Sequence, residues 1–252
     1  MKTLILAGGF GTRLREETEF RPKPMVEIGD KPILWHIMKH YYHQGFSRFL
    51  IAAGYKGHMI KDYFANYALH ASDVRIVSGQ TSKEFGNSET WDVHIRDTGL
   101  GTPTGGRIFS FRDSIDDTFF CTYGDGLANI DLAELLKFHK SHGGIATVTS
   151  TNPISRFGAI SIDESTYKVR EFVEKPQGDN WVSSGFFVFS KNIFDYLSMD
   201  SVLEEEPLRN LAKEDQLYAF KLMDFWKPMD NLRELQELNR IWDTGFAPWK
   251  NW

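Results

Sequence analysis

The chain has 252 residues, of which 41% are hydrophobic and 25% are charged. That length and composition are ample for a buried core and fit one sizeable domain. The net charge of -5 excludes a general basic field for nucleic acid or an anionic membrane, so any phosphate binding must come from a local cluster of cations.

The compartment follows from what the sequence lacks. The single cysteine, Cys121, cannot form an internal disulfide, and its apolar neighbours predict a buried thiol. No apolar stretch is long enough to cross a bilayer. The N-terminus passes from Met1 and Lys2 directly into an apolar run without a cleavable signal pattern. We therefore expect a cytoplasmic protein that binds neither nucleic acid nor membrane.

The first element is an apolar run over residues 3–7, which predicts a buried strand because it is short and ends at glycine. The turn over residues 8–13 is rich in glycine, and its backbone N–H groups can form a concavity for an anion. Thr12 adds a hydroxyl donor and Arg13 a forked cation. Lys23 follows with a proline on either side.

This loop is not specific when taken alone. It lacks the Gly-Lys-Ser/Thr ending of a P-loop and the third glycine of the dinucleotide fingerprint. A structural turn from strand to helix is an equally good interpretation of the loop by itself. The missing glycine also argues against a dinucleotide-dependent oxidoreductase.

The next elements alternate between helix and strand. Apolar residues recur at helical spacing over residues 31–44 and 57–71, and a buried strand is predicted between them over residues 48–53. This rhythm is typical of a doubly wound α/β sheet.

The middle of the chain carries a second glycine-rich loop. We expect strands over residues 74–78 and 90–97, with a mobile polar loop over 79–89 between them. Residues 98–107 then repeat the chemistry of the first loop, with glycines for backbone access, threonine hydroxyls and a terminal arginine, Arg107. A surface turn remains an alternative for this segment.

An aspartate follows the strongly apolar strand predicted over residues 118–123. Asp125 lies between two glycines just past the carboxyl end of that strand, where α/β folds place groups that handle ligands. The alternative is a turn aspartate that caps the helix predicted over residues 131–142. Asp131 is the better N-cap for that helix, which leaves Asp125 free.

The remaining elements are shorter. A strand is predicted over residues 145–150, and segments 156–160 and 169–172 suggest a small subsidiary sheet followed by Glu-Lys-Pro. Short helices are expected over 191–197 and 208–213, with a solvated acidic turn at 204–207 and a strand at 217–221. Asp230 precedes a helix predicted over 231–242, which it could cap. The aromatic tail could pack on its own chain or on a neighbouring subunit.

Several of these segments together resemble the sugar-1-phosphate nucleotidyltransferases. The likeness rests on Leu6–Leu14 (LAGGFGTRL) and Pro22–Met25 (PKPM), and residues 26–38 bring it closest to the branch that acts on CTP and glucose 1-phosphate. The resemblance covers nearly the whole chain. It implies a Rossmann-like doubly wound mixed sheet with a small subsidiary β-sheet. It also implies one domain over residues 1–252, with the sugar-binding portion at roughly 151–230.

The resemblance also implies roles for particular residues. Mg²⁺ would be held by Asp125 and Asp230, which together with Arg13 and Lys23 would form the catalytic set. The sugar phosphate would contact Glu174, Lys175, Ser183 and Gly185. The nucleotide would contact Leu6, Ala7, Gly8, Gly9, Phe10, Gly11, Thr12, Arg13, Lys23, Thr102, Arg107 and Gly124.

The sequence departs from the family pattern at one place. Ser183 and Ser184 stand where the family usually has asparagine and glycine, so the exact sugar stays open. The expected reaction transfers a cytidylyl group from CTP to glucose 1-phosphate in a homo-oligomeric enzyme. Alternatives are a transferase that uses UTP or dTTP, one that uses another sugar phosphate such as a heptose, and a catalytically inactive regulatory subunit that binds nucleotide.

Overall fold

The computed structural model describes residues 1–77, 80–85, 89–153, 159–173 and 181–252. Its centre is a mixed sheet in which β1 pairs in parallel with β4 and β8, whereas β13 is antiparallel to both of its neighbours. The strands lie in the order β14 (Leu217–Lys221), β10 (Ala146–Thr151), β13 (Val182–Phe189), β8 (Phe119–Tyr123), β1 (Lys2–Ala7), β4 (Arg48–Ala53) and β7 (Asp92–Asp97). The predicted doubly wound mixed sheet is confirmed.

Both faces of this sheet are buried, which explains why its central strands are continuous apolar runs. In β1, Ile5 and Ala7 belong to one core cluster, and Leu4 and Leu6 to another. The first core includes side chains of α2 (Ile33–His43), α3 (Gly57–His70), α5 (Leu132–His142) and α7 (Leu232–Asp243). The second includes side chains of α4 (Thr104–Phe109) and α6 (Glu206–Lys213).

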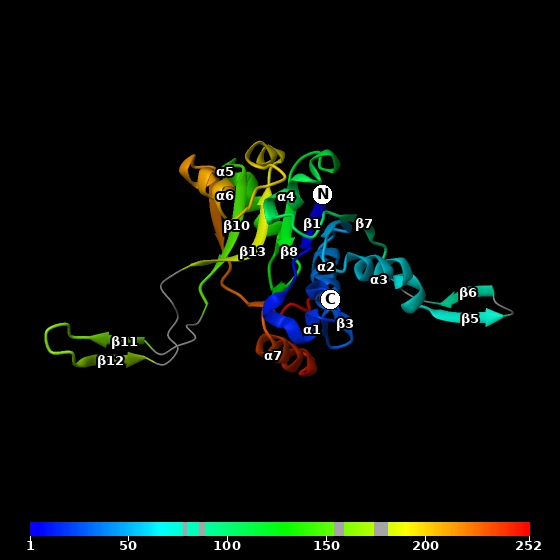
Figure 1. Ribbon diagram of the computed structural model, residues 1–252, viewed down its shortest axis with the longest axis horizontal. Coiled ribbons are helices and arrows are strands. Elements are labelled where there is room, and N and C mark those ends of the chain that lie inside the picture. The colour runs from blue at the N-terminus through cyan, green and yellow to red at the C-terminus, as the bar shows by residue number, and fades with distance from the viewer. Residues whose placement is uncertain (78–79, 86–88, 154–158, 174–180) are drawn as a thin grey trace.

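In the part of the chain that the structure describes, four two-stranded sheets accompany the main one. The β5–β6 and β11–β12 hairpins extend from the body on opposite sides (Figure 1). The other two are small ladders within the body. The pairs are β2 (Glu27–Ile28) with β3 (Lys31–Pro32), β5 (Asp73–Val77) with β6 (Gln80–Phe85), β9 (Gly126–Ala128) with β15 (Trp226–Pro228), and β11 (Ala159–Ile162) with β12 (Val169–Val173).

The remaining helical segments among the described residues are short. They are α1 (Arg15–Thr18) and the 3-10 turns η1 (Thr12–Leu14), η2 (Lys23–Met25), η3 (Arg112–Ser114) and η4 (Lys191–Tyr196). None of the described helices is long and apolar enough to cross a membrane.

The structure corrects three predicted boundaries. Part of the predicted loop 79–89 is a strand, β6, because its backbone pairs with that of β5 despite its polar sequence. The second glycine-rich loop ends at Pro103, and α4 begins at the next residue, Thr104. The acidic segment 204–207 is not a free turn, since α6 starts at Glu206 and proline suits its first turn.

The tail and the cysteine lie in the core. Trp249 and Cys121 are both fully buried, and burial raises the pKa of the Cys121 thiol. The predicted buried thiol is confirmed. The aromatic tail packs on its own chain, since Trp249 stands in the core beside α2 and α7.

Candidate active site

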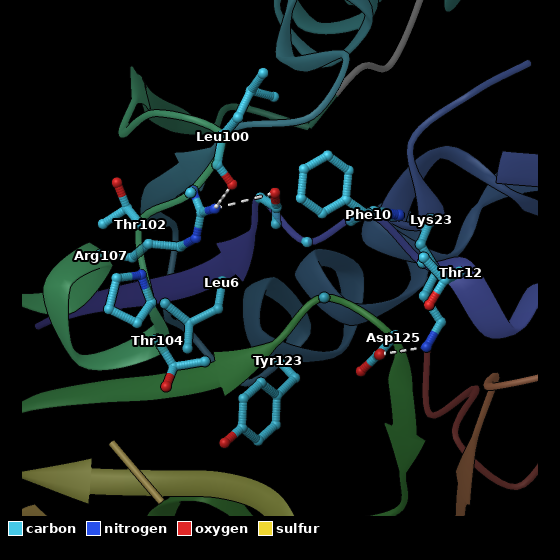
Figure 2. A pocket seen from close by; sticks show the side chains of 18 of the residues that line it. Leu6, Phe10, Thr12, Lys23, Leu100, Thr102, Thr104, Arg107, Tyr123 and Asp125 are labelled. Atoms are coloured by element: carbon cyan, nitrogen blue, oxygen red, sulfur yellow. Dashed lines mark hydrogen bonds and ion pairs between the residues drawn. The ribbon is translucent and has the colours of Figure 1, made fainter. Parts of the chain in front are cut away.

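A cavity of about 440 Å³ opens at the carboxyl ends of β1 and β8, a size typical of small-molecule sites. Its walls are the glycine-rich turn after β1, the loop between β7 and α4, and the turn after β8 (Figure 2). Every residue predicted from the resemblance to contact the nucleotide lines this cavity. Sequence reasoning missed other lining residues, among them Pro24, Leu100, Thr104 and Tyr123.

One end of the cavity is charged. The Lys23 ammonium lies 2.6 Å from a carboxylate oxygen of Asp125 and 2.6 Å from one of Asp230. The Arg13 guanidinium lies 2.8 Å from the other oxygen of Asp230. The Lys23 side chain is only 10% exposed, whereas that of Arg13 is 75% exposed. The four residues predicted as catalytic therefore form one contiguous cluster.

A short ladder brings the two aspartates together. Asp125 precedes β9 and Asp230 follows β15, and these strands pair with Gly126 opposite Pro228. The Met229 N–H also donates to the Asp125 carbonyl at 2.8 Å. Two carboxylates far apart in the sequence thus meet because of strands that the residue pattern did not reveal.

The structure excludes one of the two interpretations of Asp230, that of an N-cap for α7. The N-cap of α7 is Asn231, whose side chain accepts from the Glu234 N–H at 3.0 Å. The Asp230 carboxylate is therefore not a cap, and it points to Lys23 and Arg13 instead. Its own N–H donates to the Glu234 carboxylate at 2.7 Å, which fixes the backbone at this position.

At the other end of the cavity, Arg107 lies beneath the two glycine-rich loops. Its guanidinium donates to the carbonyls of Gly8 at 3.1 Å, Ala53 at 3.2 Å and Leu100 at 3.3 Å. The side chain is buried, and burial lowers the pKa of Arg107, although arginine stays charged at neutral pH. Arg107 lines the cavity, but its donors serve three backbone carbonyls and the Thr98 hydroxyl and so hold the loops together.

The side chain of Glu204 joins two walls of the cavity from outside. One carboxylate oxygen accepts from the Tyr123 hydroxyl, and the other accepts from the Thr104 hydroxyl at 2.6 Å. Burial and Glu204 raise the pKa of Tyr123, so the phenol remains a donor. Figure 2 shows Tyr123 and Thr104 at the end of the cavity away from Lys23 and Asp125. No sequence pattern indicates this bridge, because Glu204 lies in an acidic stretch that resembles a solvated turn.

Gly105 and Gly106, which lie in α4, serve packing more than access for a ligand. A Cβ built on Gly106 would lie 2.0 Å from the Met199 carbonyl oxygen, and one on Gly105 would lie 2.7 Å from that of Ser201. The Gly106 N–H donates to the Ser201 carbonyl at 3.1 Å. The predicted role of these glycines is therefore corrected: they let α4 pack closely on the segment before α6.

The predicted sugar-phosphate residues are only partly described. Glu174 and Lys175 lie outside the described residues. Ser183 and Gly185 are in β13, and neither lines the cavity that the structure describes. Ser183 is exposed. The neighbouring Ser184 is buried and hydrogen-bonds Thr149, with 2.6 Å between the two hydroxyl oxygens.

The donor set at the charged end suits a hard cation. Two carboxylates already converge on one cationic group, the Lys23 ammonium. Mg²⁺ in nucleotide sites typically binds one or two carboxylates together with substrate phosphates. No cluster of three or more metal-ligating side chains occurs among the residues that the structure describes, so most ligands would have to come from substrate and water. Asp125 and Asp230 therefore fit such an ion only when a phosphate is present.

Comparisons with known proteins agree with this geometry. The family model described as "Nucleotidyl transferase" matches residues 2–241. A glucose-1-phosphate cytidylyltransferase of Salmonella typhi is 48% identical over 258 residues, which cover 100% of both chains. A "probable glucose-1-phosphate cytidylyltransferase" of Bacillus subtilis is 43% identical, again over 100% of both chains. The crystal structure of HddC from Yersinia pseudotuberculosis superposes with a TM-score of 0.68 at 24% identity, covering 96% of this chain and 99% of that one.

Proposed function

The chain belongs to the nucleotidyl transferase family, and within it we propose that the protein transfers a cytidylyl group from CTP to α-D-glucose 1-phosphate. The products are CDP-glucose and pyrophosphate. The observation that carries this proposal is the cavity itself, in which a cluster of charged side chains for phosphates adjoins the space between the two glycine-rich loops, where a nucleoside would bind. Identity of 43–48% over the full chain to cytidylyltransferases supports the choice of substrates.

The reaction needs no protein nucleophile. A phosphate oxygen of the sugar phosphate is already anionic, and it attacks the α-phosphorus of CTP in line while pyrophosphate leaves. The barrier comes from bringing anions together and from charge that grows on the leaving group, so catalysis depends on positioning and positive charge. Arg13 and the amides of residues 8–12 would bind the β- and γ-phosphates, and Lys23 the α-phosphate.

Asp125 and Asp230 would hold Mg²⁺, which when bound would screen the repulsion between phosphate groups. The support is their convergence on a single cationic group. Arg107 would contribute indirectly, because it holds the loops that border the nucleoside end of the cavity.

The sugar side of the site stays a prediction. We propose that Lys175 binds the sugar phosphate, and that Glu174, Ser183 and Gly185 lie near the sugar. UTP or dTTP in place of CTP, or another sugar 1-phosphate, is the alternative within the family. Because Arg13, Lys23, Asp125 and Asp230 are all present and adjacent, an inactive regulatory subunit is disfavoured. Assembly as a homo-oligomer and a cytoplasmic location are further predictions.

A substrate panel tests this function. Pyrophosphate release is measured with Mg²⁺ and every pair from CTP, UTP or dTTP with glucose 1-phosphate, mannose 1-phosphate or a heptose 1-phosphate. We expect release only with CTP and glucose 1-phosphate together. Release with CTP and another sugar phosphate alone would refute glucose as the substrate. No release with any pair would refute the enzymatic role.

A further inference from the structure

Lys23 links the two carboxylates that are expected to hold the metal. Its ammonium is 2.6 Å from each of Asp125 and Asp230, and the side chain is 10% exposed. A buried lysine ammonium that loses its charged partners raises the free energy of the folded protein strongly. The ammonium is therefore held firmly between the two carboxylates in the protein without ligands.

The charges at this end of the cavity balance. Lys23 and Arg13 supply two positive charges, and Asp125 and Asp230 supply two negative ones. A divalent cation that entered alone would leave the cluster with an excess of two positive charges and a displaced, buried ammonium. A cation that arrives with a triphosphate brings compensating negative charge, and a phosphate oxygen is a new partner for Lys23.

The backbone of Lys23 is fixed, so that a change of partner for its ammonium must come from the side chain. Its backbone forms the 3-10 turn Lys23–Met25 after Pro22, and the Met25 N–H donates to the Pro22 carbonyl at 2.7 Å. Gly11, at φ 64°, lies against the lysine stem, because a Cβ built there would be 3.2 Å from the Lys23 Cβ. The ammonium can thus transfer from carboxylates to phosphate by rotation of the side chain alone, without movement of this turn.

From these observations we propose that Lys23 occupies the divalent-cation position between Asp125 and Asp230 until the nucleotide arrives. The inference rests on the metal role given to both aspartates in the proposed function. The free protein then binds divalent cations weakly, and the cation enters together with the nucleotide. Lys23 acts as a competitor of the metal in the free protein and as a ligand of phosphate in the complex.

Metal binding to the protein tests this directly. Mn²⁺ is titrated into ligand-free protein, and the free aqueous ion is followed by electron paramagnetic resonance. We expect weak binding to the wild type and at least tenfold tighter binding to Lys23→Met, equivalent to about 1.4 kcal/mol. Adding a CTP analogue with a non-hydrolysable α–β linkage should produce tight binding in the wild type. The gain in Lys23→Met should disappear in the double variant with Asp125→Asn.

Lys39→Met is the matched control. Lys39 also forms a largely buried ion pair, with Glu89, and neither residue lines the cavity of the candidate site. This variant should bind Mn²⁺ as the wild type does. Thermal melting checks that each variant is folded, and Lys23→Gln replaces Lys23→Met if the latter is not.

Two results would overturn the inference. One is tight Mn²⁺ binding to the free wild type, and the other is equal Mn²⁺ affinity in the wild type and the folded Lys23 variant. If the wild type makes CDP-glucose and either result is found, the inference is refuted and the proposed function stands. If Lys23→Met binds Mn²⁺ more tightly but the wild type is inactive with every substrate pair, only the proposed function is refuted.

Discussion

The guanidinium of Arg107 occupies the space directly beneath Gly8. Its Nη2 donates to the Gly8 carbonyl at 3.1 Å, and a Cβ built on Gly8 would lie 2.0 Å from Nη1. The same guanidinium donates to carbonyls of Ala53 and Leu100. One buried side chain therefore links the ends of two parallel strands to the second glycine-rich loop, and the shape of the cavity depends on it.

Replacing Arg107 should widen the nucleoside end of the cavity. Arg107→Met removes the hydrogen bonds from the guanidinium to the carbonyls of Gly8, Ala53 and Leu100, and a hydrogen bond from a charged group is worth about 1.5–3 kcal/mol. We expect a lower melting temperature and a rise of about tenfold or more in KM for CTP. The control is Arg112→Met, since Arg112 is exposed and lies outside the cavity. Equal KM values in both variants would contradict this role.

Removing a cation from the charged end should lower turnover. Arg13→Ala and Lys23→Ala should each lower kcat by about 10³-fold, as for other positioned cations in phosphoryl transfer. Arg13 is largely exposed, so its loss should leave the melting temperature nearly unchanged. Arg15→Ala, at an exposed position outside the cavity, is the control for steady-state kinetics. Near wild-type turnover in Arg13→Ala would remove this residue from the mechanism.

The Glu204 bridge should control nucleotide affinity. Glu204→Gln weakens the hydrogen bonds that orient Tyr123 and Thr104, and hydrogen bonds of this kind contribute about 0.5–1.5 kcal/mol. We expect KM for CTP to rise by up to about tenfold, with kcat and KM for glucose 1-phosphate little changed. Glu205→Gln, next to it and exposed, serves as the control. A fall in kcat at unchanged KM would point to a different role for the bridge.

Two buried histidines should make the fold sensitive to acid. Burial lowers the pKa of His36 and of His40 to about 4, from 6.5 in the unfolded chain. Between those values the unfolded chain binds more protons, so their contribution to stability is complete above pH 6.5 and is lost as the pH falls towards 4. Each histidine accounts for up to about 3 kcal/mol of this loss.

Urea unfolding at a series of pH values measures this effect. His36 contacts the Ile28 carbonyl through Nε2 at 2.9 Å, a bond that the amide of His36→Gln can replace. The free energy of unfolding should fall less steeply in the variant than in the wild type between pH 6.5 and 4. Parallel pH profiles for the two proteins would show that His36 does not titrate on unfolding.

The sequence was most informative where a local pattern decides the structure. The strand predicted over residues 48–53 has the same bounds as β4. An apolar run that ends at glycine predicts a strand without knowledge of the segments that pair with it. Asp131 is the N-cap of α5 as predicted, and its side chain accepts from the Glu134 N–H at 2.9 Å. The residues predicted to contact the nucleotide came from the family resemblance, and all of them lie on the walls of one cavity.

The rest depended on contacts between distant segments. The pairing of β9 with β15 has too few residues to leave a periodic pattern, although it brings Asp125 to Asp230. The polar strand β6 is a strand because β5 pairs with it. Glu204 was missed for the same reason, since its partners Tyr123 and Thr104 lie far from it in sequence.

The most direct test of the account is the identity of the product. Purified protein is incubated with Mg²⁺, CTP and glucose 1-phosphate whose phosphate oxygens carry ¹⁸O. The products are separated, and their masses are measured by mass spectrometry. In-line attack by the sugar phosphate predicts CDP-glucose that retains all of the label, together with unlabelled pyrophosphate. Absence of CDP-glucose, or label in the pyrophosphate, would contradict the proposed reaction.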